Sequence, residues 1–173
     1  MTTQTLLRTI TANLASHGLD LVSPFSVQTY NSQCLEGTAH MPASLPPLPT
    51  FNRPSTLGLL VANTKAIWPH FIDHAKAHRD QVEASENPLD DFVADAIQKT
   101  MTNAQVDYKV RYTHDIDDKF VHFQRLGHAI GFAFLNQTMF LSVHEKVGPW
   151  FAYRAVIVLD LECDDEPAAW EAM

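Results

Sequence analysis

The spacing of apolar side chains predicts that the chain opens with an amphipathic helix. Between residues 5 and 17 the apolar positions recur every three or four residues, which places them on one face of a helix: Leu6, Leu7, Ile10 and Leu14. Gly18 follows this segment, and glycine commonly ends a helix because it adopts the left-handed backbone conformation at little cost. The first element is therefore expected to be a helix that buries one face.

Three later segments also have the pattern of helices. The segment 64–75 carries apolar residues at helical spacing. The segment 88–101 has a stronger start signal, because Asn87 can accept amide hydrogen bonds at the N-cap and Pro88 is preset for the first helical position. A last helix is expected at 120–134.

Other segments alternate apolar and polar residues or form short apolar runs, which is typical of strands. The run 57–62 is nearly all apolar, so we expect a central strand covered on both faces. The remaining strands are expected at 25–30, 106–112, 139–144 and 150–161. A tight turn at Gly148-Pro149 is expected to join the last two strands as an antiparallel hairpin, and the proline-rich segment 31–54 is expected to be a loop.

This order of elements predicts an α+β fold, a largely antiparallel sheet flanked by helices. The length of 173 residues fits one domain, residues 1–173, with a substantial core. Only Cys34 and Cys163 are present, which is too few for a disulfide framework and lacks the spacing of iron-sulfur ligation. Reduced thiols are therefore expected.

The charge balance narrows the classes of partner. A formal net charge of -8 and a pI near 5.5 disfavour nucleic acid, because nucleic-acid binders cluster lysine and arginine against phosphates. The apolar stretches are too short to cross a bilayer, and the first residues lack the pattern of a signal peptide. We expect a soluble cytoplasmic protein that binds neither nucleic acid nor membrane.

One segment with candidate chemistry lies in the expected helix 120–134. Gly127 and Gly131 are four residues apart, on one face of that helix, beside His128. Each interior glycine costs about 1 kcal/mol relative to alanine, so the pair favours close approach of another element or of a flat ligand. On these residues alone, a helix crossing with His128 as a core histidine is the simpler interpretation, and a ligand site is the alternative.

The second such segment runs from Gly148 to Arg154, a turn that enters an aromatic strand. The planar fork of Arg154 suits a carboxylate, an amide or a phosphate if it points toward a cavity. A surface ion pair is at least as good an interpretation from spacing alone. Trp150 and its aromatic neighbours fit either the core or the wall of a ligand site.

These two segments resemble the cblC-type cobalamin-processing proteins, the family of cyanocobalamin reductases and alkylcobalamin dealkylases. The HxxG motif of the family matches residues 128–131. Its Gly-Gly-Trp-Phe-Ala-x-Arg strand is similar to residues 148–154, with Pro149 in place of the second glycine. Further similarity lies at residues 18–31 and 87–90, so the resemblance covers most of the chain.

The resemblance implies a nitroreductase-like fold that binds cobalamin base-off and supports reductive removal of its upper axial ligand. Electrons would come from FMN or FAD, free or on a flavoprotein reductase. By this analogy His128, Gly131, Gly148 and Trp150 contact the corrinoid, and Arg154 anchors a thiol cosubstrate such as glutathione. The family's later region, with its other arginines, has no counterpart in this sequence, so decyanation is expected more strongly than glutathione-dependent dealkylation.

Two other functions stay open on the residues. One is a flavin-dependent reductase of nitroreductase type that uses no corrinoid. The other is a noncatalytic tetrapyrrole or metal carrier that uses His70, His74 and His78, which follow one another at four-residue spacing. Two imidazoles one turn apart can share a metal ion, but the third reaches poorly and no HExxH glutamate is present. A solvated helix face is the favoured interpretation, so no metal site is expected.

The cobalamin hypothesis makes one structural demand. It requires a cavity between the His128 segment and the strand of Trp150 and Arg154, wide enough for a corrin ring. It leaves open whether the protein is an oxidoreductase or a cobalamin chaperone. It also leaves open a homodimer, which flavin-binding relatives of this fold often form.

Overall fold

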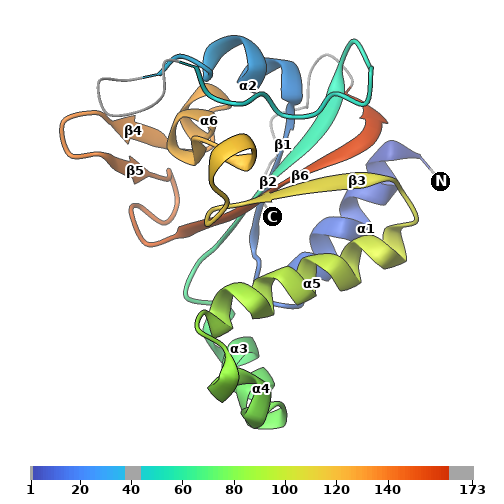
Figure 1. Ribbon diagram of the computed structural model, residues 1–173, viewed down its shortest axis with the longest axis vertical. Coiled ribbons are helices and arrows are strands. Elements are labelled where there is room, and N and C mark those ends of the chain that lie inside the picture. Colours follow the sequence, from blue (N-terminus) through green and yellow to red (C-terminus); the bar gives the residue numbers. More distant parts are fainter. Residues whose placement is uncertain (1, 38–43, 164–173) are drawn as a thin grey trace.

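The computed structural model describes residues 2–37 and 44–163, built around a four-stranded sheet with helices on both of its faces (Figure 1). In chain order the elements are α1 Thr3–Ala15, β1 Leu21–Ser26, α2 Val27–Gln33, β2 Thr56–Asn63, α3 Ile67–Ala77, α4 Arg79–Ala84, α5 Pro88–Ala104, β3 Tyr108–Tyr112, the 3-10 helix η1 Asp117–Lys119, α6 Phe123–Ala129, β4 Phe134–Asn136, β5 Leu141–Val143 and β6 Ala152–Glu162. This arrangement confirms the predicted α+β class.

The main sheet has the order β1-β2-β6-β3, and all neighbouring strands are antiparallel. Every residue of β2 is buried, which confirms the central strand predicted at 57–62. The middle of β6, from Ala155 to Leu159, is buried as well. A strand that is apolar on both faces is stable only inside a sheet covered from both sides, and β2 and β6 occupy those two inner positions.

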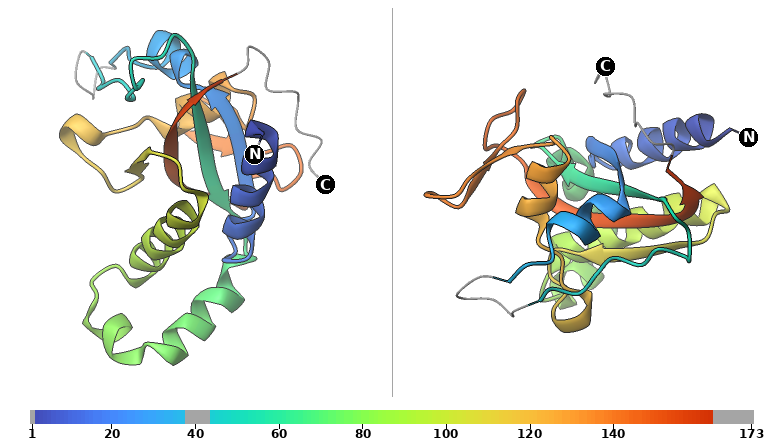
Figure 2. Two further views of the ribbon diagram at one scale, coloured as in Figure 1. Left: turned by 90° about the vertical axis from the view of Figure 1, so that its right-hand side faces the viewer. Right: turned by 90° about the horizontal axis from the view of Figure 1, so that it is seen from above.

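Two hydrophobic cores lie on opposite faces of the sheet. On one face α1 and α5 cover alternate residues of the inner strands, among them Leu59 and Ile157. On the other face α2 and α6 cover the residues between them, among them Leu60 and Val156. Figure 2 shows the sheet between these layers, while α3 and α4 extend away from it as a separate arm.

The strand predicted at 25–30 is wrong in its position. The strand is β1, Leu21–Ser26, and the chain then turns directly into helix α2. Val27 and Tyr30 are both fully buried, so the buried residues here are three positions apart, as in a helix, rather than two apart, as in a strand. Pro24 is tolerated in β1 because β1 is an edge strand of the sheet.

The helix predicted at 120–134 is also wrong, because α6 ends at Ala129. Gly131 adopts a left-handed conformation with φ of 73°. The Phe132 amide donates to the Gly127 carbonyl at 2.8 Å, and the Gly131 amide donates to the His128 carbonyl at 3.2 Å. These two bonds form a Schellman motif, which closes a helix. Gly127 and Gly131 therefore do not share a helix face.

The hairpin predicted between 139–144 and 150–161 does not form. Strand β5 pairs with β4 in a small separate sheet, whereas β6 pairs with β2 and β3. The physical reason is burial: β5 exposes Leu141 and Val143, while the buried middle of β6 needs partners on both sides. Gly148, with φ of 61°, instead closes a three-residue loop through two backbone hydrogen bonds with His144, each of 2.9 Å.

The remaining predictions fit with small shifts. The opening helix is α1, the helix predicted from residue 64 is α3 and begins at Ile67, and the helix predicted at 88–101 is α5. Asn87 occupies the N-cap position of α5, but its side chain makes no capping hydrogen bond. After α2, the loop predicted up to residue 54 contains no named helix or strand among its described residues, and residues 38–43 lie outside the description. No helix among the described residues is long and apolar enough to span a bilayer.

Candidate functional site

An open cavity of about 1540 Å³ lies at one end of the main sheet. Its walls come from five parts of the chain: the start of β1, the connection from β2 into α3, the first turn of α5, the end of α6, and the loop that leads into β6. Pockets for drug-sized ligands measure about 300–1000 Å³. This cavity is larger, so it suits a large ligand.

The structure brings three of the predicted site residues to this cavity and leaves two outside its lining. Gly131, Trp150 and Arg154 line it, whereas His128 and Gly148 are not among its wall residues. A side chain at Gly131 or Gly148 would meet no atom within 4 Å, so both glycines face open space. The cavity required by the cobalamin hypothesis lies between the end of α6 and the start of β6.

His128 is directed toward the small sheet. It is exposed, its Nδ1 accepts from the Leu135 amide at 3.4 Å, and its ring lies edge-on to Phe134 with centroids 5.6 Å apart. The interpretation of His128 as a core histidine is therefore wrong. Its contact with the corrinoid stays a prediction, and that contact would have to be made from the outer side of the loop that follows α6.

A β-bulge sets the direction of Arg154. Tyr153 pairs with Ala62 and Ala155 pairs with Val61, so Arg154 is an extra residue opposite β2. A bulge interrupts the regular alternation of side chains between the two faces of a sheet, and bulges are common beside functional sites. Here it directs Arg154 toward α5, while Tyr153 packs on the side of α6.

Arg154 is held by two partners, Asn63 in the cavity wall and Asp90 next to the wall residue Leu89. Its Nε donates to Oδ1 of Asn63 at 2.6 Å, and its Nη1 donates to Oδ1 of Asp90 at 3.4 Å. Burial lowers the pKa of Arg154 and the nearby Asp90 carboxylate opposes that shift, so the guanidinium stays charged at neutral pH. These two bonds leave other N–H donors of the guanidinium available, but a ligand carboxylate would have to compete with Asp90 for the charge of Arg154.

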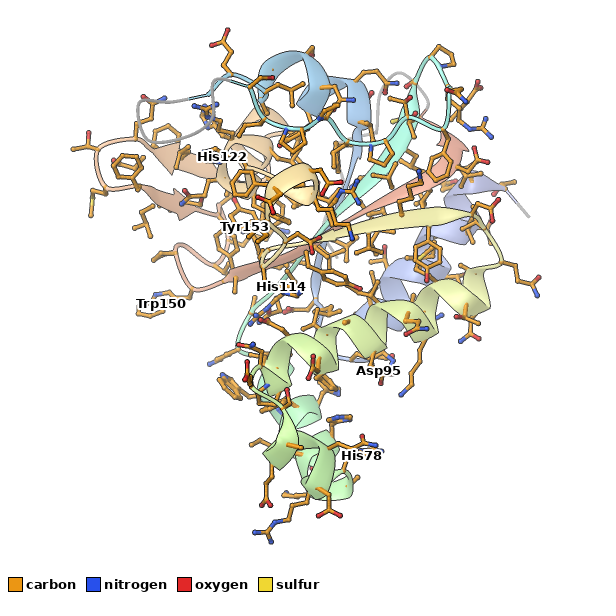
Figure 3. The ribbon with its side chains drawn as sticks, viewed as in Figure 1. His78, Asp95, His114, His122, Trp150 and Tyr153 are labelled. Atoms are coloured by element: carbon orange, nitrogen blue, oxygen red, sulfur yellow. The ribbon has the colours of Figure 1, made fainter. Side chains whose placement is uncertain are left out.

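Two tryptophans stand at the rim of the cavity from opposite parts of the chain. Trp68, in the first turn of α3, is 51% exposed, and Trp150, in the loop before β6, is 81% exposed. Figure 3 shows Trp150 projecting from that loop, away from Tyr153. Exposed aromatic rings beside an open cavity can stack on a flat ligand. Trp68 was not predicted, because it has the helical spacing of an ordinary apolar residue and its ring packs edge-on against Phe71, with centroids 5.9 Å apart.

An aromatic cluster forms the wall between the end of α6 and β6. The rings of Phe132 and Phe151 lie 5.6 Å apart, and the His144 ring lies 5.0 Å from Phe132 and 6.0 Å from Phe151. All three residues line the cavity. Sequence reasoning missed His144, because its partners come from segments that no local pattern connects.

Gly127 has a packing role behind this wall. A side chain at Gly127 would overlap the hydroxyl of Tyr153, which lies directly against the helix. The expectation that a glycine here permits close approach is confirmed, and the approaching group is a strand side chain. The hydroxyls of Tyr153 and Ser142 are both buried, and neither makes a hydrogen bond of normal length and angle to a described residue. Burial raises the pKa of Tyr153, and the nearby Ser142 hydroxyl partly opposes this rise.

The histidines of the arm do not converge. His74 and His78 stack with ring centroids 4.5 Å apart, and His74 also contacts Phe92. His70 lies instead beside Gly18. Within residues 2–37 and 44–163 no three histidine, cysteine or acidic side chains are grouped as a metal site.

Comparison with known proteins adds one structural likeness. No protein-family model matches the chain, and no curated protein matches it by sequence. The fold is similar to the crystal structure of the C. elegans B12-trafficking protein CblC, described as a homologue of human MMACHC, with a TM-score of 0.73 and 18% sequence identity. The likeness covers 94% of this chain and 72% of the CblC chain. This chain has the CblC fold. The predicted nitroreductase-like fold class is thereby confirmed.

Proposed function

We propose that this protein binds a cobalamin in the cavity at the end of the main sheet and supports reductive removal of its upper axial ligand. One observation supports this most directly. On a CblC fold, the cavity of about 1540 Å³ lies between the two segments whose residues resemble the cobalamin-processing family. The cavity is open to solvent, which gives a large rigid ligand a route of entry.

The cavity wall offers what a corrinoid needs. A corrin ring is flat and apolar on its faces and carries amide side chains around its edge. At the rim of the cavity, Trp68 and Trp150 can stack on the faces of the corrin ring. Arg154 and Asn63 provide polar groups that can hydrogen-bond with its amides. A protein that binds such a cofactor acts mainly by positioning it and by excluding water.

The proposed reaction is reductive decyanation of cobalamin bound base-off. One electron from a reduced flavin converts cobalt(III) to cobalt(II), and cyanide leaves with the bonding electron pair. Removing the lower base makes cobalt easier to reduce, so the part of the protein is to hold the base-off form. Glutathione-dependent dealkylation is less well supported, because Arg154 is already paired with the Asp90 carboxylate, which would compete with a carboxylate of glutathione.

An absorbance titration tests the proposal. Purified protein is mixed with hydroxocobalamin and with cyanocobalamin, and the expected result is a blue-shifted spectrum of the base-off form in each case. Addition of reduced FMN should then release cyanide from the bound cyanocobalamin. Unchanged spectra at high protein concentration would refute cobalamin binding.

A pair of exposed aromatic residues provides a matched control. Trp150→Ala removes a cavity residue, whereas Phe140→Ala removes a ring that is 78% exposed and is not part of the cavity wall. Both changes cost little stability because both rings are largely in solvent. Only the Trp150 variant should weaken cobalamin binding, and equal effects of the two would contradict the proposed location.

The same samples separate the proposal from its alternatives. A flavin-dependent reductase without a corrinoid should be yellow on purification and should be indifferent to cobalamin. A cobalamin chaperone should give the base-off spectrum, but reduced FMN should release no cyanide.

A further inference from the structure

His144 is a titratable group in the cavity wall with an unusual local geometry. Its ring packs edge-on against both Phe132 and Phe151, which also contact each other, so the three rings form one cluster. The backbone on either side is closed by the two hydrogen bonds between His144 and Gly148. Both the ring and its backbone are thus held in place before any ligand binds.

One ring nitrogen of His144 has a defined partner. The Lys146 amide donates to Nδ1 at 3.2 Å. An amide can donate only to an unprotonated nitrogen, so the proton of the neutral ring is on Nε2. Among the residues that the structure describes, none accepts a hydrogen bond from Nε2.

The neutral form of the ring is favoured for two reasons. Protonation at Nδ1 would break the bond from the Lys146 amide and bring two N–H groups together. Burial also lowers the pKa of His144; the charge of Glu145 opposes this shift, and that of Lys146 adds to it. The ring is therefore neutral at pH 7 and retains one N–H group, on Nε2.

We propose that His144 is a neutral hydrogen-bond donor of the cobalamin site, binding an acceptor atom of the corrinoid through Nε2–H. This inference rests on the proposed function. The acceptor is either an amide oxygen at the edge of the corrin ring or the upper axial ligand, since both present a lone pair. A donor that is already oriented loses little entropy when it binds.

The same geometry argues against His144 as a cobalt ligand. Coordination through Nε2 requires that nitrogen to be unprotonated, and the Lys146 amide already occupies the lone pair of Nδ1. A neutral ring in this position can donate through Nε2 but cannot ligate through it.

Binding titrations of two corrinoids test the inference and identify the acceptor. Cyanocobalamin has an upper axial ligand, and cob(II)alamin in its base-off form has none. His144→Phe keeps an aromatic ring in the cluster with Phe132 and Phe151 but removes the donor, so it should weaken binding about 3- to 10-fold, the worth of one hydrogen bond. Weaker binding of both corrinoids assigns the acceptor to the corrin edge, and weaker binding of cyanocobalamin alone assigns it to the axial ligand.

Three further variants make the result specific. His144→Met removes the donor without an aromatic ring and should repeat the loss. His144→Gln retains an N–H donor and should recover part of the affinity. His78→Phe is the control, since His78 lies on the arm far from Trp150 and outside the cavity wall (Figure 3).

Two results would overturn the inference while leaving the proposed function intact. One is unchanged affinity of both donor-free variants for both corrinoids. The other is a nitrogen superhyperfine splitting in the electron paramagnetic resonance spectrum of bound cob(II)alamin that His144→Phe abolishes, which would make His144 a cobalt ligand. Absence of binding by the wild-type protein is a different result, and it refutes the proposed function itself.

Discussion

Replacing Gly127 by alanine would place a methyl group in overlap with the Tyr153 hydroxyl and 3.0 Å from the ring carbon that bears it. The Tyr153 ring cannot move away freely, because it lies against Phe123, Phe132 and Phe151. Overpacking of a filled core costs about 1–3 kcal/mol, and an overlap of this severity is at the upper end. Alanine recovers about 1 kcal/mol of helix propensity over glycine.

The expected net loss is therefore about 2 kcal/mol. For a chain of this length that corresponds to a fall in melting temperature of about 4–8 °C. Thermal unfolding followed by circular dichroism measures it, and urea unfolding at constant m value confirms the change in free energy. A melting temperature equal to or above that of the wild type would show that helix propensity outweighs packing at this position.

A second substitution, at Tyr153, removes the hydroxyl that the new methyl group would overlap. Tyr153→Phe deletes a buried hydroxyl that has no hydrogen-bond partner among the described residues, so it should be neutral or stabilising by about 1 kcal/mol. In the Tyr153→Phe background, Gly127→Ala should cost less than it does in the wild type, because the hydroxyl is gone. Equal costs in the two backgrounds would refute the proposed overlap.

Three further changes have defined outcomes. Gly131→Ala should cost about 1–2 kcal/mol of unfolding free energy from backbone strain alone, since no atom lies within 4 Å, and Gly131→Asn should cost less. Burial lowers the pKa of His122, so the folded state favours the neutral ring. The contribution of this ring to the free energy of unfolding is complete above about pH 6.5 and is lost as the pH falls. His122→Asn, which can still cap α6, should make the fall in melting temperature below about pH 6.5 shallower. Arg154→Lys should recover less than half of the stability lost in Arg154→Gln, because an ammonium cannot reach Asn63 and Asp90 as the guanidinium does; the urea midpoints of the three proteins decide.

Local sequence signals were sufficient to predict an element where the residues of that segment alone favour one secondary structure. The run 57–62 is apolar enough to require burial on both faces, and Asn87-Pro88 marks the start of α5 without help from the rest of the chain. Local sequence signals gave the wrong element where a helical and a strand pattern overlapped. Residues 25–30 alternate like a strand, but Val27 and Tyr30 are buried three residues apart in α2, and tertiary packing decided between the two periods.

The candidate site was only partly predictable for a similar reason. Arg154 could be predicted because it is a single cation within an aromatic strand, and Trp150 because the segment 148–154 resembles the cobalamin-processing family. The direction of Arg154 depends on a bulge that is defined by the pairing of β6 with β2, and pairing is not visible in one segment. Trp68 and His144 both line the cavity although they are 76 residues apart in the sequence, so only the folded chain brings them together.

The inner position of β6 has a consequence for biosynthesis. This strand lies between β2 and β3, yet it follows both of them along the chain and ends at Glu162. While a ribosome is still adding residues before β6, the apolar edges of β2 and β3 have no partner, and such edges favour aggregation. The sheet can be completed only after nearly all of the described chain has emerged, so we expect the nascent protein to depend on protection by chaperones until then.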